Sequence, residues 1–101
     1  MDVCVTMQDD QTAVLVVTGR VDASNYTGLQ AAVDALDKSV ERIVFDFRDV
    51  EYVSSAGLRV LLSVHKKLMK LDGMKLINVN DAVNDVFEVT GFDEILNYEK
   101  G

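Results

Sequence analysis

The stretch DVEYVSSAGLRVLLSVHKKL, residues 49–68, decides how this chain is interpreted. It begins with residues typical of a strand, passes through two serines, an alanine and a glycine, and continues with the spacing of an amphipathic helix. At about 100° per residue, a helix over residues 55–71 puts its apolar side chains on one broad arc. The pattern predicts a strand, a tight turn and a helix that Gly73 ends as a left-handed cap. The apolar arc contains Leu58, Val60, Leu61, Leu62, Val64, Leu68, Met69 and Leu71, with His65 inside it.

Outside this stretch, strand-like and helix-like segments alternate along the chain. The run from Ala13 to Val17 is continuously apolar, which is typical of a strand buried on both faces. After an initial hairpin, strands alternate with helices, so the predicted fold class is α/β: a mixed, mostly parallel, four- to five-stranded sheet with helices packed on it. Strands are expected at residues 3–7, 13–17, 42–47 and 74–79, and helices at residues 24–38, 55–71 and about 81–90, the last capped by Asp81 and ended by Gly91, with a final short element near residues 92–98.

Function in such open sheets gathers at the carboxyl ends of the strands. Two junctions of this type stand out, Gly19 to Ser24 and Val53 to Gly57. We therefore expect the functional site where these junctions lie.

Length and composition indicate one domain that covers residues 1–101. The formal net charge of −7 argues against nucleic acid or an anionic membrane as a partner. No segment approaches the roughly 18 consecutive apolar residues of a membrane span, and the first residues lack the pattern of a signal peptide. Together with a lone cysteine, Cys4, which cannot form an internal disulfide, these features predict a cytoplasmic protein without membrane insertion.

An enzyme would need converging reactive groups, and the chain offers few. The single histidine, His65, lies about three turns into its helix, roughly 15 Å from Ser55, which is too far for it to act as a base there. No spacing points to a nucleophilic pair of Cys4 and His65, or to a metal site. We therefore expect no catalytic activity, no metal and no cofactor, and His65 fits a structural or partly exposed core histidine. A small enzyme using Cys4 or His65 is the least favoured alternative.

The helix over residues 55–71 also carries a basic strip. Its members are Arg59, Lys66, Lys67 and Lys70. The simplest interpretation is a solvated helix face, and contact with a partner is the less favoured one. The net acidity of the chain argues against nucleic acid there.

The serine pair Ser54-Ser55 allows two interpretations. One serine is expected to cap the helix by accepting a backbone N–H bond from two or three residues on. A cap does not explain Gly57, which costs about 1 kcal/mol against alanine in a helix. Small residues at 54–57 would leave the start of the helix bare, so that another protein can approach closely. A phosphate on Ser55 would add roughly 1.5 to 2 negative charges, which a helix N-terminus favours.

Three segments together resemble a known family. They are GRVDASN (19–25), IVFDFRDVEYVSSAGLRVLL (43–62) and GMKLINVNDAVNDVFEVTGF (73–92). In order and spacing they are similar to the STAS domain of bacterial anti-sigma factor antagonists, over about residues 13–98. Members of this family usually carry Asp-Ser-Ser/Thr-Gly-Leu-Gly at the central junction, and the first serine after the aspartate is the phosphoacceptor.

Matching on Gly57-Leu58 implies that Ser55 is the phosphoacceptor. The sequence departs from the family motif at three positions, with Ser54 for the aspartate, Ala56 for the second hydroxyl residue and Arg59 for the last glycine. The family's Gly-x-Leu-Asp loop lies beside the acceptor, and its aspartate is present as Asp22. The resemblance therefore implies a partner-binding surface made of Asp22, Ser24, Ser54, Ala56, Gly57 and Arg59.

The resemblance also implies a mechanism in which the chain itself catalyses nothing. The unphosphorylated antagonist binds an anti-sigma factor that is also a serine kinase, and sigma factor is released. The kinase then phosphorylates the antagonist with ATP, the complex separates, and a phosphatase resets the cycle. The alternative is a STAS protein that binds without phosphorylation, as a scaffold in a stress-sensing complex or beside a lipid transporter. Ser54 in place of the aspartate keeps that alternative open.

Overall fold

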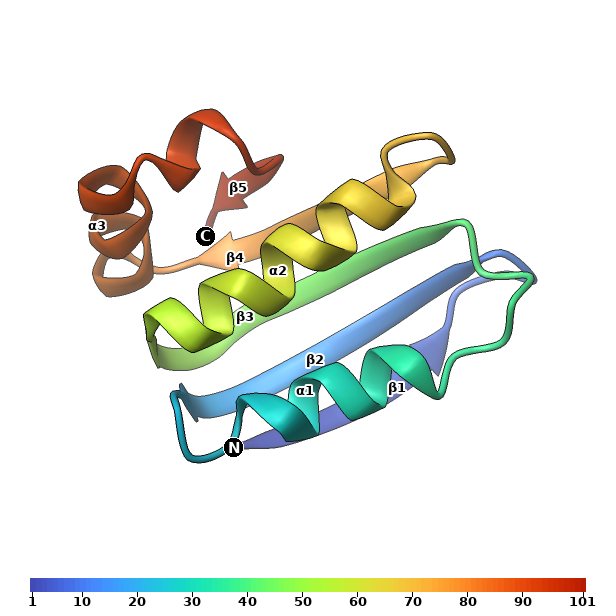
Figure 1. The fold of residues 1–101 in the computed structure, drawn as a ribbon, viewed down its shortest axis with the longest axis horizontal. Coiled ribbons are helices and arrows are strands. Elements are labelled where there is room, and N and C mark those ends of the chain that lie inside the picture. The colour runs from blue at the N-terminus through green and yellow to red at the C-terminus, as the bar shows by residue number, and fades with distance from the viewer.

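Strands and helices alternate along most of the chain, and the computed structural model describes all residues 1–101 (Figure 1). In chain order the elements are β1 (Asp2–Met7), β2 (Thr12–Val21), α1 (Tyr26–Asp34), β3 (Arg42–Val53), α2 (Ser55–Leu68), β4 (Gly73–Val79), α3 (Asp81–Thr90), the 3-10 helix η1 (Phe92–Glu94) and β5 (Tyr98–Lys100).

The five strands form one sheet in the order β1-β2-β3-β4-β5. β1 pairs antiparallel with β2, and all other neighbours pair parallel. The predicted α/β class with a mixed, mostly parallel sheet is confirmed. Parallel connections share one hand, so helices between sequential neighbours fall on the same face. Figure 1 shows α1 and α2 side by side across that face, with α3 near the end of β4.

One hydrophobic core of 23 buried residues lies between the sheet and the helices. Leu15, Phe45 and Leu76 face one another in register across β2, β3 and β4 and are fully buried. Leu29 of α1 and Leu61 of α2 cover them from the helical layer. Burial of each such side chain contributes about 1.5–3 kcal/mol, which holds both helices against the sheet.

The opposite face of the sheet carries no helix. Val14 and Val16 alternate with the buried residues of β2 and are only half-buried. The expectation that residues 13–17 are buried on both faces is therefore wrong. The physical reason is the topology, because every crossover helix lies on the same side.

α2 is shorter at its carboxyl end than predicted. It ends at Leu68, and a turn follows in which the Leu71 N–H donates to the Leu68 carbonyl. Met69 and Leu71 are 62% and 49% exposed, and Leu62 is half-buried. The buried face of α2 is therefore narrower than the predicted apolar arc. Gly73 has a φ of +86°, but it opens β4 and does not cap α2.

α1 is shorter at both ends than the predicted helix over residues 24–38. Residues 22–25 form a turn instead, in which the N–H groups of Asn25 and Tyr26 both donate to the Asp22 carbonyl. The helix begins at Tyr26 and ends at Asp34. The predicted strands over 13–17 and 42–47 are longer in the structure, because β2 and β3 continue to the junctions at their carboxyl ends.

α3 is capped by Asn80 and not by Asp81 as predicted. The Asn80 Oδ1 accepts the Val83 N–H at 2.9 Å, and Asp81 is the first helical residue. Gly91, with a φ of +80°, ends the helix in the predicted left-handed conformation. None of the helices is long and apolar enough to cross a membrane.

Candidate functional site

The two predicted junctions lie against each other at the carboxyl ends of β2 and β3. Val21 pairs with Val53 in register, and the Ser54 N–H donates to the Val21 carbonyl at 2.8 Å. This bond ties the start of α2 to the loop that begins with Asp22. The two junctions at residues 19–24 and 53–57 are therefore neighbours in the fold, and together they form the candidate site.

The two serines of the junction have different roles. Ser54 is the N-cap of α2, with extended backbone, and its Oγ accepts the Gly57 N–H at 3.5 Å. At that length the cap bond is weak. Ser55 is the first helical residue, and it is exposed. Because Ser54 makes the cap, the Ser55 hydroxyl is left facing solvent.

Gly57 is a correction to the predicted surface. It is buried, and a Cβ on it would lie 2.8 Å from Val21 Cγ1 and 2.9 Å from Val53 Cγ1. Glycine is therefore required by packing of α2 on the ends of β2 and β3, and not by the approach of another protein. Ala56 and Ser54 are half-buried and remain part of the surface.

The loop after β2 is held by its own hydrogen bonds. The Asp22 carboxylate accepts the Ser24 hydroxyl at 2.6 Å and the Ser24 N–H at 2.9 Å. The hydroxyl bond first, and the backbone bond second, hold the pKa of Asp22 below its ordinary value. Asn25 closes the turn, since its Oδ1 accepts the Asp22 N–H and its Nδ2 donates to the Arg20 carbonyl.

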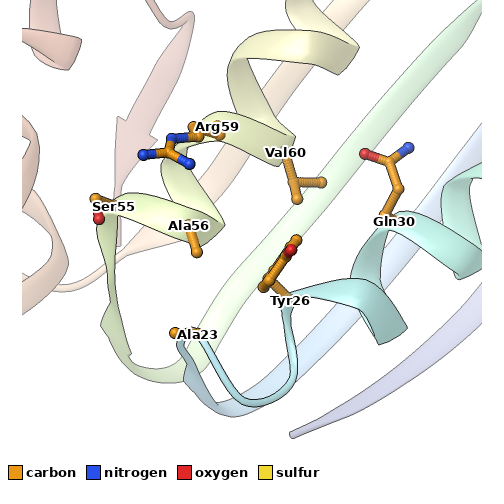
Figure 2. A pocket seen from close by; sticks show the side chains of 7 residues that line it. All are labelled: Ala23, Tyr26, Gln30, Ser55, Ala56, Arg59 and Val60. Atoms are coloured by element: carbon orange, nitrogen blue, oxygen red, sulfur yellow. The ribbon is translucent and has the colours of Figure 1, made fainter.

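A hollow of about 530 Å³ opens between this loop, α1 and α2 (Figure 2). Its lining residues are Ala23, Tyr26, Gln30, Ser55, Ala56, Arg59 and Val60. Tyr26 lies three residues before the buried Leu29, a spacing typical of one apolar helix face, but it is 37% exposed and its side chain lines this hollow. Sequence reasoning missed Tyr26 and Gln30, and only their place on the helix after the Asp22 loop could have indicated them.

Arg59 is the one charged side chain among the lining residues. The chain has two ion pairs, Lys75 with Glu99 and Lys100 with Asp81, so Arg59 belongs to neither. The remaining members of the basic strip, Lys66, Lys67 and Lys70, are exposed further along α2 and its following turn. Asp22, in the loop beside the hollow, is bonded to Ser24, and no ion pair joins it to Arg59.

Cys4 and His65, weighed for nucleophilic chemistry, lie on opposite sides of the sheet. Cys4 is exposed on β1 and pairs with Val16, which faces away from the helices. His65 is half-buried on α2, in the helical layer. The sheet therefore separates them. No three acidic, cysteine or histidine side chains are grouped to hold a metal ion.

Comparison with known proteins identifies the family of this chain. The family model described as Mlab, STAS domain matches residues 4–97. The chain belongs to the STAS domain family. This STAS domain is 38% identical over 85 residues to BtrV of Bordetella bronchiseptica, which is named as an anti-sigma factor antagonist, and the match covers 82% of this chain and 73% of BtrV.

Solved structures share the fold of this STAS domain. An anti-sigma factor antagonist from Mycobacterium paratuberculosis is 25% identical, with a TM-score of 0.82 over 99% of this chain and 87% of that one. The unphosphorylated form of the anti-sigma factor antagonist SpoIIAA is 19% identical, with a TM-score of 0.78 over 98% of this chain and 89% of that one. SpoIIAA has also been solved in a phosphorylated form. At this identity the SpoIIAA likeness bears on the fold alone.

Proposed function

We propose that this STAS domain, over residues 1–101, is an anti-sigma factor antagonist that acts by binding and not by catalysis. Its partner is an anti-sigma factor, which it binds through the surface around Ser55. The named function of BtrV and the continuous match of the family model support the assignment. The partner exchange belongs in the cytoplasm, where sigma factors act.

Ser55 is the phosphoacceptor in this proposal. The main observation in support of this assignment is that the two serines differ in structure. Ser54 caps α2, whereas Ser55 is exposed at the rim of the hollow. A kinase needs an accessible hydroxyl that is not engaged in a hydrogen bond of the fold. The first turn of α2 contains no acidic residue, so a phosphate there meets no like charge on its own helix.

Phosphorylation acts as an interface switch. It adds roughly 1.5 to 2 negative charges at the centre of the surface without disturbing the helix behind it. A partner that covers Ser55 in the unmodified complex would have to desolvate that charge. The anti-sigma factor is the serine kinase, so modification ends the complex, and a phosphatase returns the chain to its binding form.

The partner-binding surface consists of Asp22, Ser24, Ser54, Ala56 and Arg59, to which the hollow adds Tyr26. The rigid Asp22–Ser24 turn presents one side of it and the first turns of α2 present the other. Gly57 contributes indirectly, by allowing α2 to lie close to Val21 and Val53. Tyrosine and arginine are common anchors of protein interfaces, which favours Tyr26 and Arg59 as strong contacts.

The experiment is to incubate the chain with its cognate anti-sigma factor and ATP and to map phosphate by mass spectrometry. Ser55→Ala is the test variant and Ser54→Ala is the matched control. We expect phosphate on Ser55 in the unaltered protein and in Ser54→Ala, and none in Ser55→Ala. Phosphate on Ser54 or Ser24 in its place would contradict the assignment.

A binding-only STAS subunit is the second candidate. The observation that favours it is Ser54, which occupies the position of the family's aspartate beside the acceptor. In that case the anti-sigma factor, or another partner, would bind the unmodified chain and no phosphate would appear on Ser55 after incubation with ATP. The same experiment therefore separates the two.

A further inference from the structure

We propose that Arg59 holds the phosphate of phosphorylated Ser55. This inference rests on the proposed function in one respect, that Ser55 is the residue which carries phosphate. It adds a built-in partner for the modified side chain, contributed by the same helix. Arg59 is then a positioning residue for the phosphorylated state.

The spacing along α2 brings the two side chains together. Ser55 and Arg59 are four residues apart in a continuous helix, and both are exposed. Side chains with this spacing lie one above the other, with about 5–6 Å between their Cβ atoms. Both line the same hollow. Figure 2 shows the Arg59 guanidinium turned toward the Ser55 end of α2.

The Arg59 guanidinium is free to bind a phosphate on Ser55. Neither ion pair of the chain involves Arg59, and the carboxylate of Asp22, in the loop that lines the hollow through Ala23, is bonded to Ser24. No lysine, arginine, aspartate or glutamate other than Arg59 lines the hollow. No competing charge in the hollow therefore separates a phosphate on Ser55 from Arg59.

The chemistry of the pair is favourable. A guanidinium presents paired N–H donors that match two phosphate oxygens, and such charge-assisted bonds are stronger than neutral ones. The phosphate lengthens the Ser55 side chain toward Arg59, and the long arginine side chain extends toward Ser55. Once engaged, Arg59 is withdrawn from any carboxylate of the anti-sigma factor, so one modification removes a positive contact and adds a negative one.

The test uses the full chain with phosphoserine installed at position 55 during synthesis. The second pKa of the phosphate, ordinarily about 6, is measured by ³¹P NMR titration at low salt. Arg59→Gln is the test variant and Arg59→Lys the conservative one. Lys66→Gln is the matched control, because it removes the same charge from an exposed position on α2 that lies roughly 16 Å from Ser55 along the helix.

We expect Arg59→Gln to raise the phosphate pKa by about half a unit relative to the unaltered chain, since the dianion loses its cation. Arg59→Lys should keep most of the lowered value, and Lys66→Gln should leave it unchanged. Equal pKa values in Arg59→Gln and Lys66→Gln would overturn the inference. Failure of the proposed function looks different: the kinase would not modify Ser55, or the phosphate would leave anti-sigma factor binding unchanged while the Arg59 effect persisted.

Discussion

α2 and α3 both begin at the carboxyl end of a parallel strand, yet their first turns are built differently. Asn80 caps α3 with a 2.9 Å bond to the Val83 N–H, and its amide also donates to the Val50 carbonyl. Asp81 then supplies negative charge and pairs with Lys100 at 3.2 Å, which raises the Lys100 pKa above its ordinary value. The start of α3 is satisfied within the chain.

The start of α2 is left open by comparison. Its cap bond from Ser54 is 3.5 Å long, and its first turn contains no acidic residue. Ser55 and Arg59 are exposed beside the hollow instead. The start of α3 is thus stabilised by a cap and a negative charge within the chain, whereas the start of α2 lacks the negative charge that the proposed phosphorylation would add.

Gly57 gives the largest expected effect, because it sets how closely α2 approaches the sheet. Gly57→Ala should lower the free energy of unfolding by about 1–3 kcal/mol, since its Cβ overlaps Val21 and Val53. Gly28→Ala is the matched control, because its Cβ meets only the flexible end of Met1 at 3.2 Å. Urea denaturation should show that variant as neutral or more stable. Equal losses at both positions would contradict the packing explanation.

The caps give the next effect in size. Asn80→Ala should cost about 1–2 kcal/mol of unfolding free energy, because it removes a short cap bond and a bond to Val50. Ser54→Ala should cost about 0.5 kcal/mol, since its bond is long. Chemical denaturation of the two variants under the same conditions measures both values. A Ser54→Ala loss as large as that of Asn80→Ala would mean that α2 depends on its cap as much as α3 does.

Adding a negative charge to each helix start tests the electrostatic part of the comparison. Ser55→Asp should raise stability by about 0.3–1 kcal/mol or leave it unchanged, because the α2 start lacks an acidic residue. Ala82→Asp should gain less, since Asp81 already lies beside it. Thermal melts and circular dichroism give the readout. Loss of helicity in Ser55→Asp would contradict the claim that the site tolerates phosphate.

The smallest effect concerns the Asp22 turn. Ser24→Ala should raise the pKa of Asp22 toward its ordinary value, because the hydroxyl bond is the main cause of the lowering. The Asp22 pKa is lower in the folded chain, so its stabilisation is present above the unfolded-state pKa of about 3.9 and is lost as pH falls through the folded pKa. Carboxyl-carbon NMR titration measures the shift.

The control for that titration is a second turn of the same kind. Ser39 donates its N–H to Asp37 and lowers the Asp37 pKa in a similar way. Ser39→Ala keeps this N–H bond and removes only the smaller contribution of the hydroxyl, so it should raise the Asp37 pKa less than Ser24→Ala raises the Asp22 pKa, and it should leave Asp22 unchanged. A shift of the Asp22 pKa in Ser39→Ala would contradict the explanation that the hydrogen bonds within each turn set the pKa of its own aspartate.

Most of the fold could be predicted because its signals are local. Alternating strand and helix patterns gave the element order, and the Ser54-Ser55 junction pointed to the strand end on which the candidate site lies. The α/β fold class followed from the alternation of strands and helices after an initial hairpin. The STAS resemblance added the choice of Ser55 over Ser54, and the cap geometry agrees with it.

The errors arose where a residue's role depends on a distant segment. Gly57 looked like an opening for a partner, but the reason for it is Val21, which lies 36 positions earlier in the chain. Tyr26 had the spacing of a core residue, yet its ring stands in a hollow that forms only when α1 and α2 pack side by side. Val14 looked buried on both faces because a pattern does not say which face the helices cover.

In the proposed function, one phosphate on Ser55 controls binding of the anti-sigma factor. The most direct measurement is calorimetric titration of the cognate anti-sigma factor with three forms of the chain: unmodified, phosphorylated at Ser55, and Ser55→Ala. We expect phosphorylation to weaken binding at least about tenfold, equivalent to about 1.4 kcal/mol, while Ser55→Ala still binds. Equal affinity of the phosphorylated and unmodified forms would contradict it.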